Sequence, residues 1–161
     1  MNDQAKPVKP VKRASPEASL GDHKKRLRLA ELLLSVSRKI ASIDSLDEVL
    51  NTLVEMTTTA LHAERGSLFL NDAETGELYS RVAQGNIQRE IRLLNTSGIA
   101  GWVYTNSKGI IIDDAYADPR FNRTIDEQTG FVTQSVLCVP IKTVKGETMG
   151  VAQVLNKKKG R

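Results

Sequence analysis

Thr96-Ser97-Gly98-Ile99-Ala100-Gly101-Trp102-Val103 is the stretch that decides how the rest of the chain is interpreted. It has the form of a loop that leads into a helix, because Thr96 or Ser97 can cap the first turn and two glycines let the backbone approach other groups closely. The first amides of a helix lie at the positive end of its dipole, so they can hold a phosphate without any lysine. A tight packing turn would have the same sequence, and the motif alone leaves both interpretations open.

A second polar segment follows this motif. It runs Asp114-Ala-Tyr-Ala-Asp-Pro-Arg-Phe-Asn-Arg-Thr-Ile-Asp-Glu-Gln-Thr-Gly-Phe131 and is rich in turn-forming residues. The segment is long enough to fold over a group bound at the first motif. Together the two stretches predict a pocket with a lid.

The hydrophobic spacing outside these two stretches predicts an α+β fold. One helix is expected from Asp22 to about Ile43, and a capping box at 45–48 begins a second that ends at His62. Strands are expected at 66–71, 78–83, near 91–94, at 109–113 (short and buried), 135–141 and 149–155, with a helix at 98–105. Because hairpins join most of the strands, we expect an antiparallel sheet of about six strands, with the N-terminal helices on one face and the pocket on the other.

Five motifs in this order and spacing resemble a GAF domain. They are Gly98-Ile-Ala-Gly101, 114–121, Thr129-Gly-Phe131, 135–141 and 150–157. The resemblance covers roughly residues 30–161 and is greatest to the GAF domains that bind cyclic nucleotides in phosphodiesterases and bacterial adenylate cyclases. It implies a regulatory module that senses a small molecule, with cAMP or cGMP as the candidate ligand and no covalently attached cofactor.

The resemblance also implies a set of ligand-binding residues. The backbone of Ile99 and Ala100 would face the cyclic phosphate, and the remaining contacts would come from Ser67, Ala83, Gln84, Asn122, Asp126, Thr129, Thr133 and Gln153. Ser67 and Thr133 could equally satisfy backbone groups, and Asp126 could cap its own turn. Gln84 replaces an aspartate of cGMP-binding relatives, and Asn122 a tyrosine of some others. Because an amide both donates and accepts, Gln84 leaves the base open.

Composition disfavours catalysis and nucleic-acid binding. Residues 1–28 hold eight Lys/Arg and three Asp/Glu, whereas the rest of the chain holds fifteen and sixteen, so the net charge of +4 belongs to a basic leader. The two histidines lie apart, at His23 and His62, and Cys138 sits in an apolar strand without a neighbouring base. No catalytic triad or metal cluster is expected. The lack of a signal peptide or an 18-residue apolar run indicates a cytoplasmic protein.

The two ends of the chain suggest a part of a longer signalling protein. Residues 1–21 are expected to be a disordered basic leader, and 22–161 the GAF domain with its N-terminal helix. The a/d spacing of that helix predicts a homodimer seam at Leu29, Leu33, Val36, Ile40 and Ile43. Asn156-Lys157 begins the family's cyclic-nucleotide signature, but its continuation and the closing C-terminal helix are absent. We expect the seam to pass the signal to an output domain. The alternatives are a ligand-free dimerisation scaffold and a GAF domain for another small ligand.

Overall fold

A computed structural model describes residues 16–41, 45–85 and 90–158, and the chain divides into two compact units, residues 1–41 and 42–161. The first unit holds the helix α1 (Pro16–Ile40). The expected start at Asp22 is therefore wrong, and residues 16–21 are helical rather than disordered. Pro16 suits the first position of a helix because its fixed φ is already helical, and Glu17 and Ala18 are good helix formers. Residues 1–15 of the predicted leader lie outside the described part.

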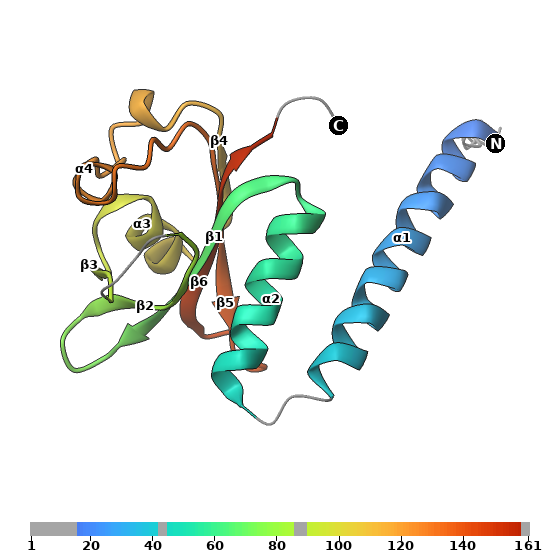
Figure 1. The fold of residues 1–161 in the computed structure, drawn as a ribbon, viewed down its shortest axis with the longest axis horizontal. Helices are drawn as coiled ribbons and strands as arrows, with labels where there is room; N and C mark the ends of the chain where they lie inside the picture. The colour runs from blue at the N-terminus through green and yellow to red at the C-terminus, as the bar shows by residue number, and fades with distance from the viewer. Residues whose placement is uncertain (1–15, 42–44, 86–89, 159–161) are drawn as a thin grey trace, which may run out of the picture. The chain divides into compact units, whose positions relative to one another are not determined.

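The second unit is built on one antiparallel sheet (Figure 1). Its elements are α2 (Leu46–Ala60), β1 (Ala63–Asp72), β2 (Glu77–Ala83), β3 (Arg92–Leu94), α3 (Gly98–Asn106), β4 (Ile110–Ile112), the 3-10 helix η1 (Ala115–Ala117), α4 (Thr124–Thr129), β5 (Val136–Lys142) and β6 (Thr148–Lys157). The strand order is β3-β2-β1-β6-β5-β4, and every neighbouring pair is antiparallel. The predicted α+β architecture of six strands is confirmed.

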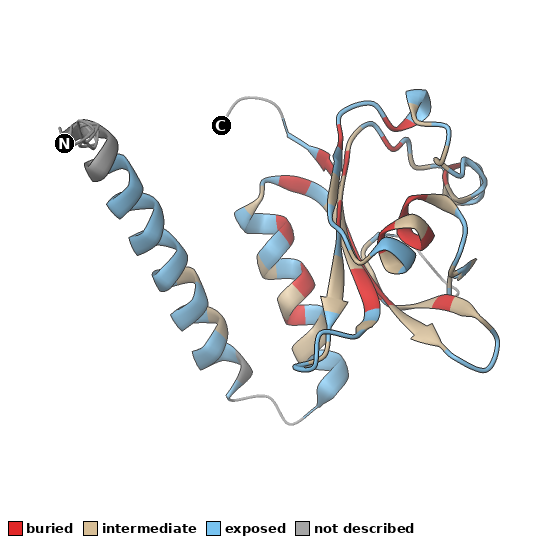
Figure 2. Ribbon diagram, turned by 180° about the vertical axis from the view of Figure 1, so that it is seen from behind, coloured by how far each residue is buried: buried red, intermediate tan, exposed pale blue. Residues whose placement is uncertain are grey.

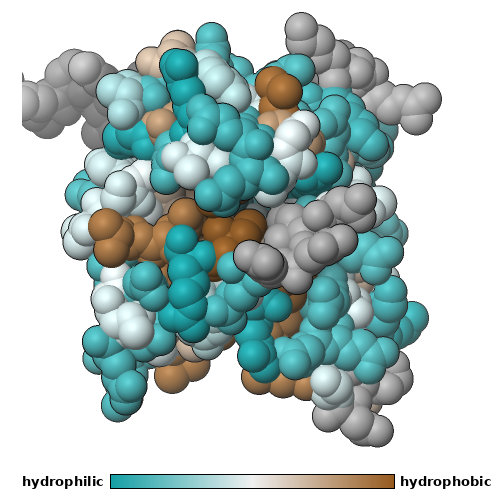
Figure 3. Space-filling model, turned by 60° about the vertical axis from the view of Figure 1, so that its left-hand side comes forward, coloured by the Kyte–Doolittle hydropathy of each residue, from teal (hydrophilic) through white to brown (hydrophobic). Residues whose placement is uncertain are grey.

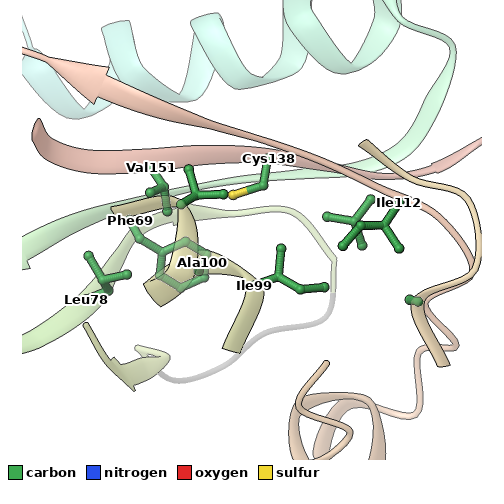
Figure 4. Close-up of a cluster of buried hydrophobic side chains, with 10 residues drawn as sticks. Phe69, Leu78, Ile99, Ala100, Ile112, Cys138 and Val151 are labelled. Atoms are coloured by element: carbon green, nitrogen blue, oxygen red, sulfur yellow. The ribbon is translucent and has the colours of Figure 1, made fainter. Parts of the chain in front are cut away.

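The alternation of side chains in β1 feeds two separate hydrophobic clusters, one on each face of the sheet. Leu68 packs with Val54 of α2 and Val82 of β2. Phe69 points the other way, into a larger cluster on the α3 side, which Figure 4 shows with Val151 and Ala100. Figure 2 shows the buried residues along the central strands and on α2 and α3. The sheet is thus covered by α2 on one face, while α3 and the lid lie on the other.

Three local expectations are wrong in detail. Ser45 and Ser97 occupy the N-cap positions of α2 and α3 in extended backbone, but neither side chain makes a capping hydrogen bond. The cap of α2 uses the Ser45 carbonyl alone, which accepts from the Val49 amide at 3.0 Å. The strand β4 is not fully buried, because it is the edge of the sheet and its central Ile111 is 74% exposed.

Candidate ligand-binding site

A cavity of about 250 Å³ lies between the α3 face of the sheet, the first turn of α3 and the lid. Figure 3 shows hydrophobic side chains in a band across this side of the molecule, with hydrophilic ones above and below. The ten residues expected from the resemblance all line this cavity: Ser67, Ala83, Gln84, Ile99, Ala100, Asn122, Asp126, Thr129, Thr133 and Gln153. The fold therefore brings them together, while contact with a ligand stays a prediction for each of them.

The first turn of α3 opens into the cavity. Ser97, Gly98, Ile99 and Ala100 all line it. Gly98 has a φ of 73°, a left-handed conformation that a glycine adopts without strain. The helical hydrogen bonds of α3 begin at the Gly101 amide, which donates to Ser97 O at 3.1 Å. The amides of Ile99 and Ala100 precede it and face no capping side chain in the described structure, so this turn can receive an anion.

Gly101 allows the close backbone approach that was expected of the glycines in this motif. A methyl group at this position would lie 2.9 Å from the backbone carbon of Thr96 and 3.1 Å from that of Asn95. The glycine thus allows α3 to pack closely on the turn that precedes it. It supports the position of the first turn and supplies no amide to the cavity.

Hydrogen bonds at the β1–β2 end of the cavity hold polar side chains in place. The side-chain Oε1 of Gln84 accepts from the Gly66 amide at 2.8 Å, and the Gln84 amide donates to Gly66 O at 3.0 Å. Across β1, Gln153 Nε2 donates to Ser67 Oγ at 3.1 Å. The Ser67–Gln153 contact fixes both side chains on the floor of the cavity without a ligand. Gln84 also lines a second pocket, with Thr58 and Thr59 at the end of α2.

The lid is anchored by the buried carboxylate of Asp126, which is 6% exposed. Its Oδ2 accepts from the Thr133 amide at 2.6 Å and from the Tyr116 hydroxyl at 3.1 Å, and its Oδ1 accepts from Thr133 Oγ1 at 2.7 Å. Partial burial and the hydrogen bond to Asp126 raise the pKa of Tyr116 above its usual value. The expectation that Asp126 could merely cap its own turn is wrong, because its partners come from both sides of α4.

Residues 114–121 form the outer part of the lid through short-range contacts. Asp114 Oδ1 accepts from the amides of Tyr116 and Ala117, which begins η1. Asp118 accepts two hydrogen bonds from the Arg120 guanidinium, at 2.9 and 2.6 Å. This contact lowers the pKa of Asp118 to about 2. The Arg120 guanidinium in turn lies 4.8 Å from the Trp102 ring centroid, which joins the lid to α3.

Asn156 joins three segments of the chain, and Lys157 follows it. The Asn156 side chain accepts from the Gln134 amide at 2.6 Å and donates to Val132 O at 2.8 Å and to Glu64 Oε2 at 3.0 Å. Its φ of 55° turns the end of β6 toward the lid. Lys157 Nζ donates to Leu61 O at 2.9 Å, beyond the end of α2. Neither residue lines the cavity, so both support the site from outside.

Two residues outside the predicted ligand-binding set close the cavity, and only Phe131 belonged to a motif that the sequence analysis singled out. Arg65 and Phe131 both line it, and the Arg65 guanidinium carbon lies 4.0 Å from the centroid of the Phe131 ring. This cation–π contact joins the start of β1 to the lid. The sequence could have predicted Arg65 as a cavity residue, because it lies two residues before Ser67 in the same strand and therefore on the same face.

The Cys138 thiol is buried in the hydrophobic core. Burial raises the pKa of the Cys138 thiol to about 12, and the side chain is fully enclosed in the α3-side cluster. No group of three or more His, Cys, Asp or Glu that could hold a metal occurs in the described part of the chain. None of the helices within it has the length and apolar character to cross a bilayer.

Comparison with known proteins agrees with this architecture. Residues 45–161 match the family model of the GAF domain. The chain is 35% identical over 149 residues to a probable 3',5'-cyclic phosphodiesterase of Caenorhabditis elegans, which covers 84% of this chain and 20% of that protein. It is 34% identical over 152 residues to the dual 3',5'-cyclic-AMP and -GMP phosphodiesterase 11 of Drosophila melanogaster. That match covers 84% of this chain and 10% of the Drosophila protein. The chain thus spans a fifth or less of these relatives.

A solved structure shares the fold at lower identity. The GAF domain of a phosphoenolpyruvate-protein phosphotransferase from Coxiella burnetii superposes with a TM-score of 0.74 and 22% identity, covering 83% of this chain and 80% of that one. At this identity the likeness concerns the fold alone.

Proposed function

Since the chain belongs to the GAF domain family, we propose that it is a regulatory module whose cavity binds a cyclic nucleotide, cAMP or cGMP, within a cytoplasmic signalling protein. One observation carries the proposal. Residues from β1, β2, α3, the lid and β6 converge on a single cavity that has unpaired helix amides at one side and polar side chains at another. That arrangement offers a phosphate site and a base site under one cover.

The chemistry of the cavity suits such a ligand. The cyclic phosphate would accept from the amides of Ile99 and Ala100, whose helix dipole favours a negative charge. Phe121 and Ile125 of the lid and Leu155 of β6 provide apolar walls for the ring system. The volume of about 250 Å³ lies just below the roughly 300–1,000 Å³ typical of small-molecule sites, which favours a compact ligand.

Binding would act through the lid. The contacts of Arg65 with Phe131 and of Arg120 with Trp102 join the lid to β1 and to α3, so an occupied cavity stabilises the closed arrangement. A ligand that binds this arrangement better shifts the population toward it. In our proposal α1 carries that shift, through a helical dimer, to an output domain of the longer protein.

Calorimetric titration of the chain with cAMP and with cGMP tests the proposal. We expect a dissociation constant in the micromolar range or tighter for at least one of them, which corresponds to about −8 kcal/mol. Ala83 pairs with Ser67 on the cavity face, so Ala83→Leu adds bulk to the cavity wall without removing a hydrogen bond. This variant should lose binding and keep its melting temperature, whereas Ala73→Leu in the exposed β1–β2 turn should bind as the parent does.

The alternative is a GAF domain that serves as a dimerisation scaffold. It is favoured by the leucines of α1, since Leu29 and Leu33 are each 57% exposed in the single chain. The melting temperature of a sensor rises when the nucleotide is added, whereas that of a scaffold changes only with the concentration of the protein itself. Absence of heat with both nucleotides, from a folded protein, would favour the scaffold or another ligand.

A further inference from the structure

The leucines of α1 lie on two opposite sides of the helix. Leu27 and Leu34 are seven positions apart and share one side, whereas Leu29 and Leu33 are four apart and share another. Each residue turns an α-helix by about 100°, so the two positions from Leu27 to Leu29 cross to the opposite side. Figure 2 shows α1 exposed along most of its length, and these four side chains are between 52% and 61% exposed. Such a concentration of apolar side chains in solvent indicates a surface that a partner covers.

The segment of α1 that carries these leucines is strongly basic. Residues 23–39 hold one acid, Glu31, and six bases on either side of it: Lys24, Lys25, Arg26, Arg28, Arg38 and Lys39. The whole of residues 1–41 holds ten Lys/Arg and four Asp/Glu, whereas residues 42–161 hold thirteen and fifteen. The positive charge of the chain therefore belongs to the unit of α1, and a partner that covers its leucines meets basic side chains around them.

The two-sided arrangement of the leucines distinguishes between kinds of partner. An anionic bilayer receives one face of a helix, so it would leave one of the two leucine pairs in water. A second copy of α1 in the predicted seam also covers one side, that of Leu29 and Leu33, and leaves Leu27 and Leu34 exposed. Nucleic acid attracts the bases but buries no leucine against its phosphates. An acidic protein that encloses the helix covers both sides and pairs with the bases.

We propose that α1 is a docking helix for an acidic EF-hand protein, whose calcium-loaded lobes expose methionine-rich grooves and close around the leucines of both sides. In such a complex the apolar residues of an amphipathic helix enter a hydrophobic groove, and flexible methionines adapt to them. The Asp and Glu side chains of the partner pair with the bases at the two ends of residues 23–39. This inference goes beyond nucleotide binding. Because the partner covers Leu29 and Leu33, it competes with the α1 dimer seam.

Calorimetric titration of the parent chain with calmodulin, as the probe of this chemistry, tests the inference with calcium and with a chelator. We expect a dissociation constant of about 1 μM or tighter with calcium and no detectable binding with the chelator, because calcium exposes the grooves. Bound calcium lowers the negative charge of the probe, so a merely electrostatic contact would persist in the chelator. Sedimentation of the calcium-loaded mixture should show a complex that contains one chain, since the dimer seam is covered.

The substitution Leu34→Glu tests the side of α1 that the dimer seam does not use. It places a carboxylate in the apolar groove of an acidic partner, so the affinity for calcium-loaded calmodulin should fall at least about tenfold. Ser35→Glu is the matched control, because it adds the same charge at the next, exposed position and should keep the affinity within about threefold. Circular dichroism and the melting temperature, both expected to match the parent, show that each variant is folded.

Four results would overturn the inference. They are no heat with calcium-loaded calmodulin from a folded parent chain, equal binding in the chelator, unchanged affinity of Leu34→Glu, and a complex that still contains two chains. Cosedimentation with vesicles of phosphatidylcholine and phosphatidylserine identifies the rival, since vesicle binding without calmodulin binding would make α1 a membrane-surface helix. None of these measurements involves a nucleotide, so the inference can fail while the proposed function stands.

Discussion

Asp126 shows how a residue of the predicted site can act mainly on the fold of the lid. Its carboxylate accepts hydrogen bonds from the Thr133 amide, the Thr133 hydroxyl and the Tyr116 hydroxyl. Asp126→Ala leaves these donors without their acceptor in a buried site, so we expect it to lower the free energy of unfolding by about 2–4 kcal/mol. Urea denaturation measures the change.

Tyr116→Phe is the graded control for Asp126, since it removes only the most exposed of the three hydrogen bonds and should cost about 1 kcal/mol or less. An unchanged urea midpoint in Asp126→Ala would show that the carboxylate does not anchor the lid. Because of this structural role, loss of nucleotide binding in Asp126→Ala would not by itself identify a ligand contact. Ala83→Leu is the better probe of the cavity.

Asp118 makes the stability of the lid depend on pH. Its pKa falls from 3.8 to about 2, chiefly because Arg120 donates to the carboxylate. A depressed folded-state pKa adds stability above the unfolded value, and that stability is lost as the pH falls from about 4 toward 2. At pH 6 we expect the free energy of unfolding of the parent chain to exceed that of Asp118→Asn by no more than about 2 kcal/mol. This difference should shrink to zero toward pH 2. Urea unfolding at a series of pH values measures it, and a gap constant with pH would contradict the ion pair.

At the scale of the element, the first turn of α3 depends on close packing against the turn before it. Gly101→Ala would place a methyl group 2.9 Å from the Thr96 carbon and 3.1 Å from Leu94 O, both backbone atoms that cannot rotate away. We expect a loss of about 1–3 kcal/mol in thermal or urea unfolding, typical of overpacking.

The same change at Gly21 is the control for Gly101. Gly21 lies inside α1 with no neighbouring atom within 4 Å, so alanine there should be neutral or mildly stabilising. If both variants unfold like the parent, α3 tolerates a shift away from residues 94–96. The open first turn would then not depend on that packing.

The elements that the sequence predicted well are those with strong local patterns. The predicted strand at 66–71 is present within β1, and its alternation puts Leu68 and Phe69 in the two clusters on opposite faces. The predicted capping hydrogen bonds of Ser45 and Ser97 were wrong, because a suitable residue at the N-cap position does not ensure the bond. The start of α1 was also wrong, since Asp22 is a good cap but Pro16 is an equally good first residue.

The candidate site was predictable as a set but not in the roles of its members. The family motifs predicted ten residues that all line one cavity, yet the residue type at Gln84 indicated no base preference. Only the contact with the Gly66 amide, set by the pairing of β1 and β2, shows that its carbonyl is already used. The hydrogen bonds that Asp126 makes with Thr133 and Tyr116 also depend on tertiary structure, so the sequence could not show them, while its contact with a ligand stays a prediction.

At the scale of the whole molecule, the two units carry different tasks in our proposal. The sheet separates the α2 cluster from the cavity side, so a bound ligand acts first on α3 and the lid. The helix α1 forms a unit of its own and presents leucines to solvent. Of the predicted seam, Leu29 and Leu33 are exposed and Val36 is half-buried, whereas the side chains of Ile40 and Ile43 lie outside the described residues.

A charge in the α1 seam should separate dimerisation from ligand binding. Leu33→Glu places a carboxylate at an a/d position, where a partner helix would bury it without a counter-charge, so we expect the dimer to dissociate. Sedimentation equilibrium over a range of concentrations measures the change. Ser35→Glu introduces the same charge on the outer side of the same helix and should leave the parent's mass distribution intact.

Nucleotide affinity should remain in both variants because the cavity lies within residues 65–155. A parent chain that is monomeric at every concentration would remove α1 as the dimer seam, and a Leu33→Glu chain that dimerises normally would place the interface elsewhere.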